Sequence, residues 1–194
     1  MNLTDFVKSV NVTDLLIVLG LFAFFILGFI QGTVRRIVGI LSMVFSFFVA
    51  SIIQVPLGDF LAKNWTQFPP EYAAMVGYLT MFVAAVLAFT LVIQGTYNKT
   101  QLFPKYPVFD EVLGGLLGVI QGFLLLMFLT IILDQAFLKA NPSSQNELPF
   151  LRDIWSAIDG SAFGNLLHTT VIPNFVALFS FLLPDGIKST YGVH

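Results

Sequence analysis

Four stretches of this sequence contain no aspartate, glutamate, lysine or arginine, and each is long enough to cross a membrane as a helix. They are residues 15–34, 37–58, 72–98 and 112–133, with lengths of 20, 22, 27 and 22 residues. A helix needs roughly 20 residues, at about 1.5 Å each, to span a ~30 Å hydrocarbon core. The four stretches therefore predict an all-α membrane protein with four transmembrane helices.

The composition agrees with a chain that is surrounded by lipid. Hydrophobic residues make up 57% of the sequence and charged residues 10%, which is far from the balance of a water-soluble domain. Lipid requires every backbone polar group to be bonded within the protein, and the stretches lack the alternating pattern of a β-barrel. We expect one transmembrane domain over residues 12–137, with helices at 12–31, 36–60, 72–97 and 111–137.

The remaining segments are more polar. We expect an N-terminal tail at 1–11, a polar loop at 138–149 and a C-terminal tail at 185–194. Residues 150–184 are predicted to form amphipathic and interfacial or re-entrant helices. Residues 150–158 place their apolar side chains on one helical face, which can lie on the membrane or pack on the bundle. Residues 160–184 are uncharged but include many polar residues, so we do not expect a fifth span.

The basic residues near the helix ends predict the topology. Arg35 and Arg36 form the only adjacent basic pair and lie between the first two apolar stretches. Cytoplasmic loops carry an excess of lysine and arginine. We therefore place this pair in the cytoplasm, with both termini outside. The two arginines are interpreted as topology anchors that meet lipid phosphates, or as a specific lipid or partner site.

Two groups of glycines are spaced by four residues. Gly28 and Gly32 form one group, and Gly114, Gly118 and Gly122 form the other. Glycines at this spacing line one face of a helix and allow a second backbone to approach closely. The pattern fits ordinary helix packing, and it also fits a dimer interface or a gate.

Several functional classes find no support in the sequence. There is no cysteine, and the two histidines, His168 and His194, do not form a His-x-x-x-His metal pair. No nucleophile elbow or phosphate-binding loop is present, and no ionisable residue lies deep inside the four uncharged stretches. The net charge of −2 argues against a nucleic-acid partner. We therefore expect no enzymatic activity, no cofactor and no metal.

The order of several short motifs resembles the CvpA family, the colicin V production proteins. Asp14 opens the first helix, and the run from Gly28 through Gln31 to Gly32 is soon followed by Arg35. The fourth helix opens with the glycine-rich element Gly114-Gly115-Leu116-Leu117-Gly118, which Gly122 continues, and Gln31 and Gln121 stand where family members often have a basic residue. An acidic residue then precedes Ser161, and a Leu-Pro ending follows at 183–184. The resemblance covers roughly residues 12–185.

This resemblance implies a bacterial inner-membrane protein that acts in toxin (colicin V or bacteriocin) production or export and in envelope homeostasis. Its partners would be the lipid bilayer, further copies of itself and secretion or envelope proteins. One hypothesis is a non-enzymatic protein that acts through helix–helix contacts, as an oligomer. The alternative is a small channel or transporter subunit with a glycine-lined pore, and an intramembrane enzyme is the least supported reading.

Overall fold

The fold is all-helical in the part of the chain that the structure describes. The computed structural model describes residues 11–66, 69–96, 102–103, 105–138 and 149–192, and within these ranges it contains helices and no strand. The four longest helices have the length and apolar character to span a membrane, namely α2 (Val12–Gln31), α3 (Thr33–Asn64), α4 (Pro70–Thr96) and α5 (Pro107–Phe137). The predicted fold class is confirmed. The expected tail at 1–11 and loop at 138–149 lie almost wholly outside the described residues.

The join between the first two helices is shorter than expected. Gly32 alone turns the chain, with φ at +80°, a backbone conformation that glycine adopts without strain. Its N–H group donates to the carbonyl oxygen of Gly28 and closes α2. Helix α3 therefore begins at Thr33 and not at residue 36. As a consequence, Arg35 and Arg36 lie in the first turns of α3 and not in a loop.

Three other helix boundaries extend beyond the expected ones. Helix α4 begins at Pro70, two residues before the expected start. Helix α3 runs through Pro56 and ends at Asn64, beyond the expected limit of residue 60. Helix α5 begins at Pro107, four residues before the expected start. Proline suits the first position of a helix, because the missing N–H group has no partner there in any case.

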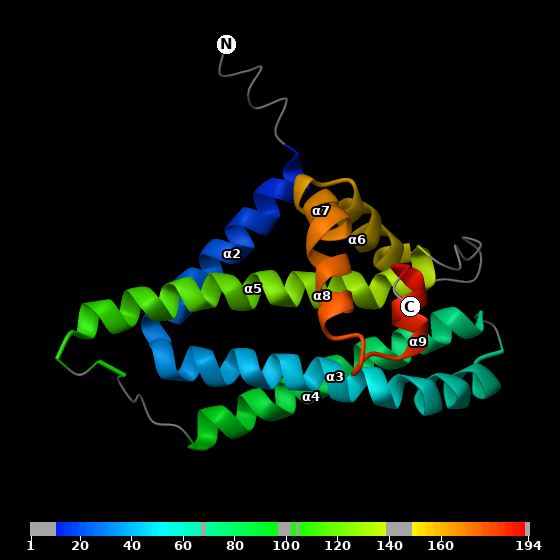
Figure 1. Ribbon diagram of the computed structural model, residues 1–194, viewed down its shortest axis with the longest axis horizontal. Coiled ribbons are helices and arrows are strands. Elements are labelled where there is room, and N and C mark those ends of the chain that lie inside the picture. Colours follow the sequence, from blue (N-terminus) through cyan, green and yellow to red (C-terminus); the bar gives the residue numbers. More distant parts are fainter. Residues whose placement is uncertain (1–10, 67–68, 97–101, 104, 139–148, 193–194) are drawn as a thin grey trace, which may run out of the picture.

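The long helices form two closely packed pairs. Helices α3 and α4 form an antiparallel hairpin, and α2 packs along α5 (Figure 1). Helix α5 also contacts α3 and α4 and so joins the two pairs. The α2–α3 join and the start of α5 lie at one end of the bundle, and the end of α5 lies at the other (Figure 1).

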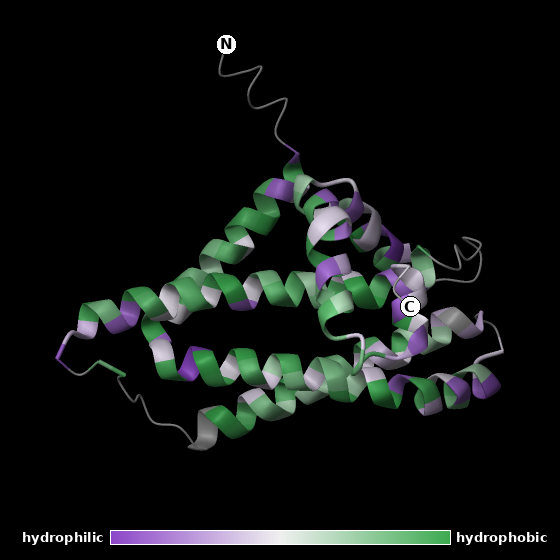
Figure 2. Cartoon of the chain, viewed as in Figure 1, coloured by the Kyte–Doolittle hydropathy of each residue, from purple (hydrophilic) through white to green (hydrophobic). Residues whose placement is uncertain are grey.

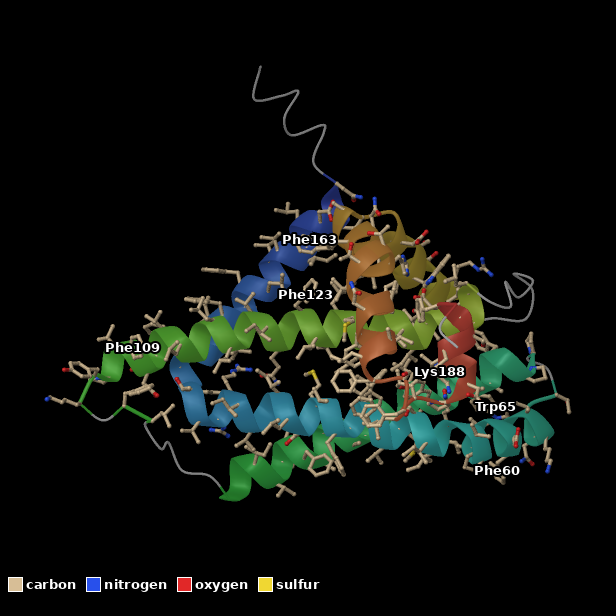
Figure 3. The ribbon with its side chains drawn as sticks, viewed as in Figure 1. Phe60, Trp65, Phe109, Phe123, Phe163 and Lys188 are labelled. Carbon is tan, nitrogen blue, oxygen red and sulfur yellow. The ribbon has the colours of Figure 1, made fainter. Side chains whose placement is uncertain are left out.

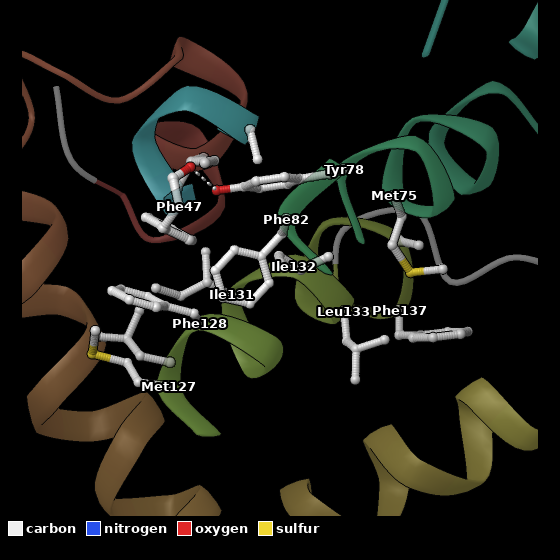
Figure 4. Close-up of a cluster of buried hydrophobic side chains, with 14 of the residues drawn as sticks. Phe47, Met75, Tyr78, Phe82, Met127, Phe128, Ile131, Ile132, Leu133 and Phe137 are labelled. Atoms are coloured by element: carbon white, nitrogen blue, oxygen red, sulfur yellow. Dashed lines mark hydrogen bonds between the residues drawn. The ribbon is translucent and has the colours of Figure 1, made fainter. Parts of the chain in front are cut away.

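The core lies where α3, α4 and α5 meet. Phe47, Tyr78, Phe82 and Phe128 expose 1% of their surface or less (Figure 4). The rings of Phe47 and Phe128 stack with their centroids 4.1 Å apart. The Tyr78 hydroxyl donates to the carbonyl oxygen of Phe47, so its polar end is satisfied within the core.

The C-terminal segment forms a chain of short helices that covers the bundle. They are α6 (Pro149–Asp159), α7 (Ala162–Leu166), the π-helical turn η2 (Leu167–Val171), α8 (Ile172–Leu178) and α9 (Asp185–Thr190). Leu167, Ile172 and Val176 are completely buried. The ring of Phe175 lies 6.0 Å from that of Phe47 and 5.7 Å from that of Phe128. The segment expected to be interfacial or re-entrant is thus packed onto the core.

Residues 185–194 are not the simple tail that the sequence predicted. Helix α9 forms over Asp185–Thr190, and Ile187 has no exposed surface. One apolar side chain is too weak a periodic signal to predict a helix. Its burial against the bundle supplies the stabilisation that the local sequence lacks.

The long helices consist mostly of apolar residues (Figure 2), and many of their large apolar side chains are exposed. In α2 only Gly28 is buried, and large side chains such as Phe22 and Ile30 are more than half exposed. Phe109 and Phe60 are 52% and 62% exposed and lie at opposite ends of the bundle (Figure 3). A bilayer solvates such side chains, so the chain is a multi-pass membrane protein.

Candidate functional site

The two glycine stripes of the sequence face each other within one chain. The backbones of Gly28 and Gly114 are in such close contact that a Cβ atom on either residue would overlap backbone atoms of the other. A Cβ atom on Gly118 would likewise overlap the carbonyl oxygen of Phe24, and one on Gly122 would lie 2.9 Å from the Phe24 ring. These four glycines therefore form the contact between α2 and α5.

Gly32 has a different position from its sequence neighbour Gly28. It lies in the turn, and a Cβ atom there would lie 2.9 Å from Oδ2 of Asp110. Asp110 is buried at the start of α5, and its Oδ1 accepts from the N–H group of Leu102. The hydroxyl of Thr33 donates to the Asp110 carbonyl oxygen at 2.8 Å. The turn is thus fastened to the beginning of α5.

A buried arginine lies one turn further along α3. Arg36 exposes 5% of its surface, and its Nη1 donates to Oε1 of Gln121 at 2.6 Å. Its Nε is buried and has no hydrogen-bond partner among the described residues. No described carboxylate forms an ion pair with it. A buried cation is normally paired, because desolvation of an unpaired charge is costly.

A cavity of about 130 Å³ opens beside this arginine. Its lining brings together four of the residues that the sequence singled out, Gln31, Arg35, Arg36 and Gln121, and adds Leu27, Gly39, Thr90 and Ile93. Figure 2 shows the corresponding hydrophilic patch at the start of α3, within otherwise apolar surroundings. The cavity offers positive charge and amide groups at one end of the bundle.

A buried aspartate forms the second polar centre, at the other end of α5. Asp134 has no exposed surface and accepts hydrogen bonds from three side chains. They are Trp155 Nε1 on α6 at 2.8 Å, His168 Nε2 on η2 at 2.9 Å, and the hydroxyl of Tyr191 at the end of α9. One carboxylate therefore ties three separate C-terminal elements to α5.

His168 lies between two carboxylates. Its Nε2 meets Asp134, and its Nδ1 is 3.3 Å from Oδ1 of Asp159. The hydrogen bond to Asp134 raises the pKa of His168, burial opposes this shift, and the charges of Asp134 and Asp159 add to it. Burial and the nearby charge of Asp134 raise the pKa of Tyr191, so its hydroxyl stays protonated.

Sequence reasoning missed Asp134 and the role of His168. Asp134 directly follows the fourth uncharged stretch and lies inside the expected helix at 111–137. An acidic residue inside a predicted span is itself a signal, since such residues are costly there. The partners Trp155, His168 and Tyr191 lie 21 to 57 positions away and share no spacing pattern. Only the fold brings them together.

Two further residues from the sequence motifs meet at the start of α7. Ser161 caps this helix, because its hydroxyl accepts from the N–H group of Gly164 at 2.8 Å. Asp14 in the first turn of α2 accepts from the N–H groups of Ala162 and Phe163 at 3.2 and 3.3 Å. These contacts join the beginning of the first long helix to the C-terminal segment.

The described residues contain no group of three or more histidine, aspartate or glutamate side chains arranged to hold a metal ion. A model of the protein family described as "Colicin V production protein" matches residues 13–170. This range includes Asp14, all of the glycine contact, Asp134 and His168, and it ends before Tyr191. Neither a curated protein nor a solved structure matches the chain.

Proposed function

Because this chain belongs to the colicin V production protein family, we propose that it acts in the production or export of a bacteriocin of the colicin V type and in envelope homeostasis. It would do so as a non-enzymatic membrane protein that works through contacts between helices. The family match over residues 13–170 carries this proposal. The glycine contact between α2 and α5 supports it, because all the glycines of this close helix contact lie within the matched range.

We also propose that the chain resides in the bacterial inner membrane, with both termini outside. Arg35 and Arg36 lie in the first turns of α3, directly after the α2–α3 join, and this join is at the same end of the bundle as the start of α5 (Figure 1). Basic residues favour the cytoplasmic side. Cysteine labelling of intact cells at Ser156 on α6 tests this orientation. Labelling by an impermeant reagent is expected, and labelling only after lysis would reverse the orientation.

The partners in this proposal are the lipid bilayer, further copies of the chain and secretion or envelope proteins. The glycine stripes are engaged within one chain, so a self-association surface would lie elsewhere. The exposed apolar face of α2 is available for such contacts. Cross-linking in membranes and mass measurement in detergent would determine the oligomer size.

The role in bacteriocin production is tested by complementation. A colicin V-producing strain that lacks its own family member would receive the wild-type gene, Gly118→Leu or Gly20→Leu. A leucine at Gly118 would collide with the Phe24 backbone, whereas a Cβ atom at Gly20 on α2 would meet nothing within 4 Å. We expect wild type and Gly20→Leu to restore the secreted inhibitory titre and Gly118→Leu to lose most of it. Failure of the wild-type chain to restore any titre would refute the proposal.

The alternative of a glycine-lined pore gains no support from the stripe on α5, because backbone and ring atoms of α2 occupy its surface. Purified protein in liposomes distinguishes the two functions. We expect no ion or small-solute flux above that of empty liposomes. Robust flux that Gly118→Leu abolishes and Gly20→Leu preserves would replace the helix-contact function with a channel.

A further inference from the structure

The cavity beside Arg36 has the properties of an anion-binding site, because no carboxylate in the described part of the chain pairs with its positive charges. Only 5% of the Arg36 surface is exposed, so the side chain is 95% buried. Its Nε has no hydrogen-bond partner among the described residues. Arg35 adds a second positive charge to the cavity wall. The buried carboxylate at this end, Asp110, accepts instead from the Leu102 N–H group. Two positive charges therefore share one cavity with no described ion-pair partner.

The size and the donor set define the ligand. The cavity of about 130 Å³ is well above the roughly 10–15 Å³ that one water requires on the same measure, and it is large enough for one tetrahedral oxyanion. Guanidinium groups and side-chain amides are the donors that phosphate oxygens prefer. The Oε1 atom of Gln121 already accepts from Arg36, so its amide nitrogen is the end left for an anion. Leu27 and Ile93 provide the apolar part of the wall.

We infer that this cavity binds a phosphate group through Arg35, Arg36 and Gln121. Two sources share this chemistry, the headgroup of an anionic phospholipid and free inorganic phosphate. The cavity lies at a helix end next to the lipid-facing side chain of Leu27, which is 47% exposed, so a headgroup reaches it from the membrane. Anionic lipids are attracted to juxtamembrane arginines and lysines. This inference is independent of the role in bacteriocin production.

Thermal unfolding of the delipidated full chain in neutral detergent tests the site. Phosphatidylglycerol, phosphatidylcholine and inorganic phosphate are added separately. A ligand that binds only the folded chain raises Tm progressively with its concentration. A rise with phosphatidylglycerol alone identifies a lipid headgroup, and a rise with inorganic phosphate as well identifies a site open to the free anion. A rise with neither, or an equal rise with phosphatidylcholine, would overturn the inference.

Substitutions of the cavity arginines test whether the ligand binds in this cavity. Arg36→Gln is expected to raise Kd about tenfold or more, the change that follows from losing a charge-assisted hydrogen bond. Lys63→Gln removes one positive charge from the exposed far end of the same helix and is expected to leave Kd unchanged. If Arg36→Gln does not yield folded protein, Arg35→Gln at its half-buried position provides the same test with a smaller increase in Kd. An unchanged Kd in the arginine variant that folds would refute the site.

Discussion

Asp134 and Arg36 are buried charged side chains at opposite ends of the bundle, and their hydrogen-bonding groups are satisfied to very different degrees. Asp134 accepts from three side chains that belong to three different elements. Arg36 has one described partner, the amide oxygen of Gln121, and borders a cavity. Both side chains are almost fully excluded from solvent.

This difference separates a structural charge from a binding charge. The carboxylate of Asp134 has about four acceptor positions, and Trp155, His168 and Tyr191 use three of them, so it holds the C-terminal segment in place. The Nε donor of Arg36 has no hydrogen-bond partner among the described residues, and a cavity lies beside the guanidinium group. A buried charge that the fold leaves incompletely paired indicates that something outside the fold completes it.

The largest expected effect is that of Asp134→Ala. It would leave three donors without an acceptor, and loss of one partner from a buried charged network typically costs about 3–5 kcal/mol. We expect a large drop in Tm in detergent and rapid proteolysis of the C-terminal segment. Thr130→Val is the matched control, because Thr130 is equally buried one turn earlier and its hydroxyl bonds only to Leu126 of its own helix. Equal losses of Tm in the two variants would contradict the role of Asp134 in holding the C-terminal segment.

The second effect is the pH dependence of C-terminal docking. The pKa of His168 is raised in the folded chain above the ordinary value of about 6.5, so its charged form stabilises the folded state. This contribution is complete below pH ~6.5 and is lost as the pH rises through the raised pKa. We expect protease resistance of the C-terminal segment to fall as the pH rises above about 6.5 and through the raised pKa of His168. His168→Gln should remove this dependence, and an unchanged pH profile in that variant would assign it to another group.

A smaller effect is expected from Ser161→Ala. It removes the cap of α7, a loss that typically costs about 1 kcal/mol. The three hydrogen bonds to Asp134 would still hold the C-terminal segment, so Tm should fall slightly while this segment remains protease-resistant. Ser156→Ala is a matched control, because the Ser156 hydroxyl is exposed and bonds only within α6. Complete detachment of the segment in Ser161→Ala would mean that the cap and not Asp134 holds it.

The smallest effect is expected from Arg36→Met in detergent without anionic lipid or phosphate. This change loses the charge-assisted hydrogen bond to Gln121, worth about 1.5–3 kcal/mol, and this loss is offset because it also removes a buried charge that lacks a described ion-pair partner. We expect Tm to stay close to that of wild type, in contrast to Asp134→Ala. A loss as large as that of Asp134→Ala would show that Arg36 is a structural charge of the same kind.

Much of the fold follows from local sequence alone. The four spans are determined by uncharged stretches that exceed the thickness of a bilayer, because lipid leaves an apolar chain few alternatives to a helix. The boundary errors are local as well. Helix α3 starts early because Gly32 makes the whole turn, and α5 starts early because Pro107 suits a first helical position.

The element that each helix face contacts could be identified only from the tertiary structure. The glycine spacing determined that Gly28 and Gly118 would support close packing, but not that the partner lies in the same chain. The sequence placed Arg36 and Gln121 in separate helices and gave no sign of the cavity between them. It gave no sign that Asp134 gathers His168 and Tyr191 either. Composition and periodicity record the preference of each residue for lipid or water, whereas hydrogen bonds between distant side chains exist only once the fold sets their distances.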